Sequence, residues 1–245
     1  MKRLLVLLFV MSVLLACSKE NRWDAVKGAG RQDSLVLDMP AFQYVKVDKN
    51  LQVYLHVDTF YRMQITGGKN LLPLIEQTID ADGVLYLTDN NRCNWSRSYK
   101  QTVRIDLTMP ALLGVEQIGV GNIIALDTIR SEVFTLDVRN SGNVRLLMQA
   151  GTMHSNLHVS AGDIFLSGRC GVSYLYNSGP GNIHADSLRT DITFAGNHDT
   201  GLIYTNTIGL LEAEVDYSGD IYYVGSPDSL VVRESNTGRV LPLIR

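Results

Sequence analysis

The chain has 245 residues, of which 45% are hydrophobic and 19% are charged, and its formal net charge is −3. This length fits a single β-rich domain. No block of basic residues is present, which excludes nucleic acid from the expected partners. Without Lys2 and Arg3, the remaining 20 basic and 25 acidic residues give a formal charge of −5.

The N-terminus has the parts of a bacterial lipoprotein signal. Lys2 and Arg3 precede an apolar run over residues 4–15, and the tetrapeptide Leu14-Leu15-Ala16-Cys17 resembles a lipobox. The apolar run is too short to span a bilayer comfortably. We therefore expect residues 1–16 to be a signal peptide and Cys17 to be lipidated, so that the mature chain is anchored to a membrane. A plain secretory signal with an incidental cysteine is the alternative.

The residue after the lipobox bears on the destination of the chain. Ser18 stands where an aspartate would favour retention in the inner membrane. The sequence therefore predicts an outer membrane lipoprotein, at the cell surface or on the periplasmic face. Residues 17–36 lack clear periodicity and are expected to form a tether. We expect residues 37–245 to fold as one domain.

The first part of this domain, residues 37–110, is the less regular one. Apolar and polar residues alternate in several short segments, which predicts strands over residues 42–47, 51–57, 61–65, 84–87 and 102–109. Residues 89–100 are polar and predict a protruding loop. No segment of the mature chain has the pattern of a strong amphipathic helix.

A glycine recurs about every 20 residues through the second part, residues 111–245. The column consists of Gly121, Gly142, Gly162, Gly181, Gly201, Gly219 and Gly238. Two residues after each glycine stands an isoleucine or a valine, namely Ile123, Val144, Ile164, Ile183, Ile203, Ile221 and Val240. The residue between them is Asn or Asp except at Leu202 and Arg239. A fixed period indicates one supersecondary unit stacked on copies of itself.

The repeat predicts an all-β chain folded as a right-handed parallel β-helix, or β-solenoid, with coils of about 20 residues. Each coil would comprise a strand, a Gly-Asn/Asp turn and a second strand, with the glycine supplying a positive φ at the corner. The aliphatic column would form an internal ladder, in which burying each side chain contributes roughly 1.5–3 kcal/mol.

The Asn and Asp residues of the turns are expected to stack in a row. The row contains Asn122, Asn143, Asp163, Asn182 and Asp220. Oxygens converging from neighbouring coils would suit a glycan or a calcium ion. A ladder of hydrogen-bonded turns needs no ligand and is the favoured interpretation. Only Asp163 is acidic across four consecutive coils, so the row does not offer a catalytic pair of carboxylates.

The order of the motifs resembles that of a known family. Phe42-x-x-Val45-x-Val47 is followed by a strand ending near Gly68, by Asn70-Leu71-Leu72, by Asp82-Gly83-x-Leu85 and by the Gly-Asn-Ile coils. This order is similar to the head GIN domain family of auto-transporter adhesin domains, frequent as lipoproteins of Bacteroidetes. The resemblance covers about residues 38–240. It implies a right-handed β-helix-like fold at the cell envelope and a role in adhesion, and it brings no catalytic residues.

Two polar segments are candidates for ligand binding. Trp95, with Tyr99 and Arg92 in the polar loop, would stack on a sugar ring. The corner over residues 196–201 holds His198 and Asp199 and breaks the regular turn. It is either a local binding loop or simply a longer corner. Tyrosines of the strands at 174, 176, 222 and 223 would also stack on sugars where they face outward.

Metal binding and catalysis find little support in the sequence. His154 and His158 lie on one face of a strand but roughly 13 Å apart, too far for one ion. We predict no metal, no cofactor and no enzymatic activity, because no nucleophile stands with a base. The cell envelope permits a disulfide between Cys93 and Cys170, and the sequence leaves that pairing open.

Three classes of function follow from these features. The favoured one is a non-catalytic envelope adhesin that binds a glycan or a protein through a β-helix face. The first alternative is a carbohydrate-active enzyme, a polysaccharide lyase or hydrolase, on the same fold. The second is an envelope scaffold that assembles by stacking coil ends.

Overall fold

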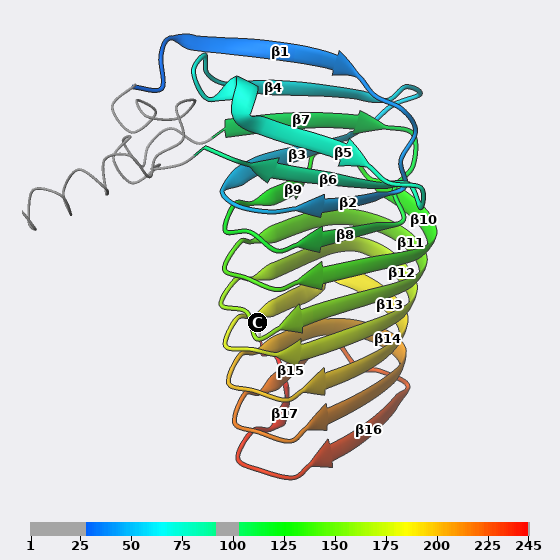
Figure 1. Cartoon of the computed structure of the whole chain (residues 1–245). Coiled ribbons are helices and arrows are strands. Elements are labelled where there is room, and N and C mark those ends of the chain that lie inside the picture. Colours follow the sequence, from blue (N-terminus) through cyan, green and yellow to red (C-terminus); the bar gives the residue numbers. More distant parts are fainter. Residues whose placement is uncertain (1–27, 92–102, 245) are drawn as a thin grey trace, which may run out of the picture.

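A computed structural model describes residues 28–91 and 103–244 of the chain. These residues form a β-solenoid of about six turns of roughly 20 residues each (Figure 1). The all-β parallel solenoid expected from the glycine repeat is thereby confirmed. Residues 1–27, which include the predicted signal peptide and Cys17, and residues 92–102, which include Arg92, Trp95 and Tyr99, lie outside the described part.

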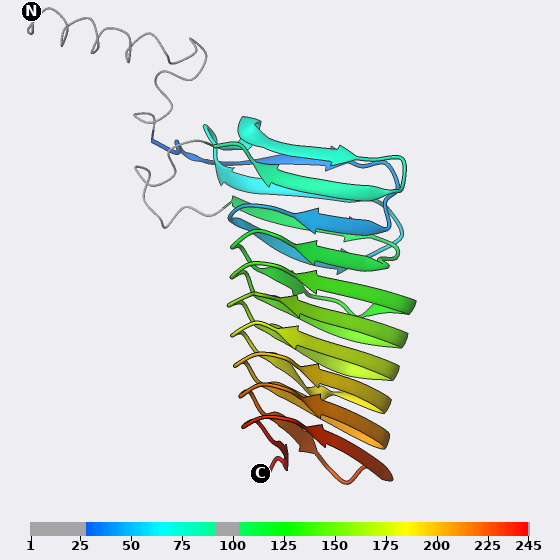
Figure 2. The ribbon, with the colours of Figure 1, turned by 60° about the horizontal axis from the view of Figure 1, so that its bottom comes forward.

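Long strands that continue around one side of the solenoid build the regular coils. Each bends midway and so contributes to both faces, and it pairs in parallel with the strand of the next coil. Figure 2 shows these coils stacked one on the next toward the C-terminus. The long strands are β11 (Val144–His158), β12 (Ile164–Ser178), β13 (Ile183–Asn197) and β14 (Ile203–Val215). Before them, β10 (Ile129–Val138) contributes to the second face. After them come three shorter strands, β15 (Ile221–Val224) and β17 (Val240–Pro242) on the first face and β16 (Ser229–Glu234) on the second.

Shorter elements form the N-terminal part. They are β1 (Gln32–Asp38), β2 (Tyr44–Val47), β3 (Leu51–Val57), β4 (Arg62–Gly68), the 3-10 turn η2 (Leu72–Leu74), β5 (Ile75–Ile79), β6 (Val84–Asp89), β7 (Val103–Met109), β8 (Gly114–Gln117) and β9 (Ile123–Ala125). The first face of the solenoid contains β3, β7, β9 and the N-terminal halves of β11 to β14. The second face contains β2, β6, β8 and the C-terminal halves of β10 to β14.

An antiparallel cap closes the N-terminal end of the solenoid. Strand β4 pairs antiparallel with β7, and β1 pairs antiparallel with β4 (Figure 1). On the second face, β5 pairs antiparallel with β6. The tether predicted for residues 17–36 is therefore wrong for residues 32–36, which belong to β1. This strand is almost wholly exposed, so the usual alternation of buried and exposed residues is absent from it.

The aliphatic column forms the predicted internal ladder. Ile164 pairs in register with Val144 and Ile183, and Ile203 with Ile183 and Ile221. All five side chains are fully buried, at 0% exposure. Together with the inward residues of the second face they make one continuous core along the solenoid axis.

The glycine column serves a different purpose from the one predicted. Among the described glycines, positive φ angles occur at Gly30, Gly83, Gly168 and Gly225, and none of these belongs to the column. The column glycines are instead required by the close approach of neighbouring coils. A Cβ atom on Gly201 would lie 1.8 Å from the carbonyl oxygen of Gly181, which leaves no room for any side chain.

The Asn and Asp residues beside the glycines form a ladder of hydrogen bonds between coils. The side-chain oxygen of Asn143 accepts a bond of 2.8 Å from the backbone N–H of Asp163. Asp163 accepts one of 2.8 Å from Asn182, which in turn accepts one of 2.9 Å from Leu202. The interpretation of this row as a turn ladder is confirmed, because these oxygens are engaged along the stack.

Candidate functional site

The structure places two of the predicted site residues, and their side chains have separate roles. Nδ1 of His198 lies 2.7 Å from Oδ2 of Asp216, and its ring packs against Tyr176 at 4.9 Å between centroids. The carboxylate of Asp199 accepts a 2.7 Å hydrogen bond from the N–H of Thr200 and so shapes its own turn. The corner is thus a hydrogen-bonded turn, with His198 joined to the second face.

Outward aromatic rings form two stacks along the solenoid. Neighbouring rings lie 4.7–5.4 Å apart and within 17° of parallel. The faces of the inner rings are therefore covered by other rings, and only their edges meet solvent. For Tyr174 this removes the sugar-stacking surface that the sequence predicted. The first face carries Phe165, His184, Tyr204 and Tyr222, and the second carries His154, Tyr174 and Phe194.

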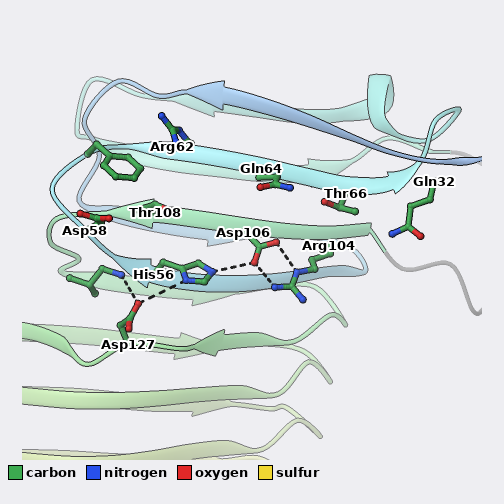
Figure 3. A pocket seen from close by; sticks show the side chains of 12 residues that line it. Gln32, His56, Asp58, Arg62, Gln64, Thr66, Arg104, Asp106, Thr108 and Asp127 are labelled. Atoms are coloured by element: carbon green, nitrogen blue, oxygen red, sulfur yellow. Dashed lines mark hydrogen bonds and ion pairs between the residues drawn. The ribbon is translucent and has the colours of Figure 1, made fainter.

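A concave surface of a different kind lies beside the N-terminal cap on the first face. We name it the polar groove; it measures about 720 Å³ and is open to solvent. Figure 3 shows the side chains that line it, from β1, β3, β4 and β7 and from the loops beside them. Strand β3 supplies His56, β4 supplies Arg62, Gln64 and Thr66, and β7 supplies Arg104 and Asp106.

Strand alternation explains why these polar residues share one surface. In the antiparallel pairing of β4 with β7, Gln64 stands opposite Asp106 and Thr66 opposite Arg104. The residues between them, such as Ile65 and Ile105, are fully buried. The inward residues thus fix the register of the cap, and the polar residues of both strands must then point outward into the groove.

The strongest interaction in the groove joins Arg104 to Asp106. The guanidinium donates two hydrogen bonds to the carboxylate, from Nε at 2.7 Å and from Nη2 at 2.6 Å. This pairing lowers the pKa of Asp106 against the opposing effect of its partial burial, and it raises the pKa of Arg104. The guanidinium also lies over the ring of Tyr54, at 4.0 Å from the centroid.

The neighbouring groups complete a network of donors and acceptors. Nε2 of His56 lies 3.2 Å from Asp106, and Asp127 accepts a 3.1 Å bond from the N–H of Val57. Arg62 lies over the ring of Phe60 at 4.7 Å. Phe60 itself is 39% exposed. The groove therefore offers planar polar groups beside one apolar ring, and Asp106 is held ionised, which makes it an acceptor and a poor acid.

One protein family matches the sequence over most of the solenoid. Residues 41–227 match the family described as "Putative auto-transporter adhesin, head GIN domain". The chain belongs to the head GIN domain family. No curated protein matches the sequence. The order of motifs from Phe42 onward had indicated this family, and that prediction is confirmed.

Solved structures with the same fold share little sequence with this head GIN protein. A putative adhesin from Bacteroides fragilis is 22% identical, with a TM-score of 0.82 over 89% of this chain and 100% of the other. A putative adhesin from Parabacteroides merdae is 17% identical, with a TM-score of 0.66 over 89% and 98% of the two chains. A putative lipid binding protein from Parabacteroides distasonis is 16% identical, with a TM-score of 0.68 over 88% and 98%.

The described residues of this head GIN domain offer neither a metal site nor a reactive thiol. In ranges 28–91 and 103–244, no three His, Cys, Asp or Glu side chains are arranged to hold a metal ion. Cys170 is buried, and desolvation raises the pKa of its thiol to about 11, which makes it a poor nucleophile. Its pairing with Cys93 stays open, since Cys93 lies outside the described part.

Proposed function

We propose that this head GIN protein is a non-catalytic adhesion module of the cell envelope that binds a glycan in the polar groove. The family description and the names of the similar structures support an adhesin-like role. The single observation that carries the proposal is the groove itself, which gathers the charged and amide side chains of β3, β4 and β7 around one exposed ring.

The chemistry of the groove suits a polyhydroxylated ligand. Sugar hydroxyls both donate and accept hydrogen bonds, and vicinal pairs of them match the planar ends of Arg, Asp and Gln side chains. Arg104 has used two donors on Asp106 and retains others for a ligand. The partly exposed ring of Phe60 would contact the apolar C–H face of a sugar.

Binding to an array of bacterial and host polysaccharides tests the proposal. We expect Arg62→Ala and Gln64→Ala each to weaken binding of the recognised glycan roughly tenfold, because each removes side-chain hydrogen bonds to the sugar hydroxyls. Gln149→Ala is the matched control, since Gln149 is exposed on β11 and lies outside the groove. If Arg62→Ala and Gln64→Ala bind the glycan as tightly as Gln149→Ala, the polar groove is not the glycan site. Release of reducing or unsaturated ends from the polysaccharide would contradict a non-catalytic module.

For its location, we propose an outer membrane lipoprotein held by a lipid on Cys17. Within the described ranges, no helix has the length and apolar character of a membrane span. Protease added to intact cells should degrade the protein if the solenoid faces outward, and protection until lysis would assign it to the periplasmic side. Cys17→Ser should release the protein from the membrane fraction, whereas retention of that variant would contradict lipid anchoring.

A further inference from the structure

The ring stack on the second face ends at Phe194. Its neighbour on the N-terminal side is Tyr174, at 5.0 Å, but the residue in register on the next coil is Glu212. One face of the Phe194 ring therefore has no aromatic partner. Beside it, Gly196 stands between Tyr176 and Glu214 in the adjacent column, and the ring of His198, which packs on Tyr176, lies over this glycine.

This gap is a small groove of about 260 Å³, which we name the aromatic-acid groove. Its walls are the rings of Tyr174, Tyr176 and Phe194 and the side chains of Glu212 and Glu214. Both tyrosines are 39% exposed. A groove of this size, open on one side, accommodates one side chain of a partner and does not enclose a whole metabolite.

The charge of the aromatic-acid groove favours a cation. Nη1 of Arg233, on β16, lies 2.6 Å from Glu212 and 3.9 Å from Glu214. One guanidinium thus faces two carboxylates, and the Glu214 side chain is still 50% exposed. The excess of negative charge disfavours an acidic glycan here and leaves a carboxylate able to pair with a further cation.

Elsewhere in this protein, arginine guanidinium groups lie over aromatic rings. The guanidinium of Arg145 lies 4.3 Å from the ring of Phe165, at the N-terminal end of the other stack. That of Arg104 lies over Tyr54 while it pairs with Asp106. At Phe194 the ring face and the carboxylates are present, yet among the described residues no guanidinium lies over this ring.

We propose that the aromatic-acid groove binds the guanidinium of an arginine side chain presented by a partner protein. The planar cation would stack on the face of Phe194 that has no aromatic partner and donate hydrogen bonds to Glu214. Lysine fits less well, because a compact ammonium neither stacks as a plane nor donates in a fork. This site lies on the opposite face from the polar groove and is independent of glycan binding.

Titration of the protein with short peptides, followed by NMR shifts of the Phe194 and Glu214 amides, tests this proposal. The peptides are identical pentapeptides, acetylated and amidated, with a central arginine, lysine or citrulline between glycines. We expect the arginine peptide to bind several-fold more tightly than lysine and at least roughly tenfold more tightly than citrulline, its neutral isostere. Free arginine amide should bind no more tightly than the peptide; a much tighter complex would assign the site to a small molecule and overturn the proposed protein partner.

Variants separate this site from the rest of the fold. Glu214→Gln and Phe194→Leu should each weaken the arginine peptide roughly tenfold, while Glu76→Gln, at an exposed glutamate of β5, should leave it unchanged. Glycan binding in the polar groove should survive Glu214→Gln, so the two proposals fail separately. Equal binding of the citrulline peptide, no shift at millimolar peptide, or full binding by Glu214→Gln would each overturn the arginine site.

Discussion

Ile183→Asp is expected to leave the protein unfolded or severely destabilised at room temperature. Ile183 is fully buried, between Ile164 and Ile203 of the adjacent coils. The substitution removes an apolar side chain, at a cost of about 2–5 kcal/mol, and buries a carboxylate without a partner, which costs several more. That total is comparable with the whole free energy of unfolding of a domain, about 5–15 kcal/mol. Circular dichroism during urea titration measures the effect.

Two control variants isolate the cause of this loss. Ile183→Val keeps the ladder and should cost only about 0.5–1.5 kcal/mol. Ser141→Asp adds the same charge at an exposed turn and should change stability by less than about 0.5 kcal/mol. If Ile183→Asp unfolds at the same urea concentration as the parent, the aliphatic ladder does not hold the coils together.

Gly201→Ala is expected to destabilise the protein by about 3 kcal/mol or more, as overpacking against rigid atoms does. Its new Cβ would lie 1.8 Å from the carbonyl oxygen of Gly181 and 2.7 Å from that of Gly179. Both neighbours are backbone, so relief requires two coils to separate and their hydrogen bonds to lengthen. For a protein of this size the melting temperature should fall by roughly 6–12 °C.

The matched control is Gly28→Ala, because nothing lies within 4 Å of a Cβ atom at Gly28. Thermal unfolding of this variant should follow that of the parent. A small effect at Gly201 would show that neighbouring coils tolerate a wider spacing than the structure has. A positive φ is not the cause at Gly201, so any loss there reports the contact alone.

Repetition explains why the second half of the fold was predictable from the sequence. Each glycine of the column stands two residues before an Ile or Val. These Ile and Val residues pair with one another from each coil to the next. The pattern could not distinguish the two reasons for a glycine, since a missing side chain serves positive φ and close contact equally. In the structure, close contact between neighbouring coils is the reason for the column glycines. Strand β1 escaped prediction because its stability depends on pairing with β4, about 30 residues away.

The candidate site was less predictable, for a related physical reason. Gln64 and Asp106 meet only because β4 pairs antiparallel with β7, and the sequence around either residue does not indicate that pairing. Alternation within each strand could have identified both as outward residues, although not as neighbours. The polar corner with His198 could be recognised in the sequence because it is continuous in the chain. His198 pairs with Asp216 one coil away and lies outside the polar groove, so its role in ligand binding stays a prediction.

The antiparallel cap closes one end of the solenoid, and the coils beyond it repeat the same parallel pairing. Each coil contacts only the coils beside it, so a whole coil inserted near the C-terminus would leave the cap and the polar groove unchanged. Such an insertion would lengthen the solenoid by about 4.8 Å, the spacing between paired strands. Reach and recognition can therefore evolve separately in this architecture: the number of coils sets how far the distal end extends, while the cap-proximal surface keeps its chemistry.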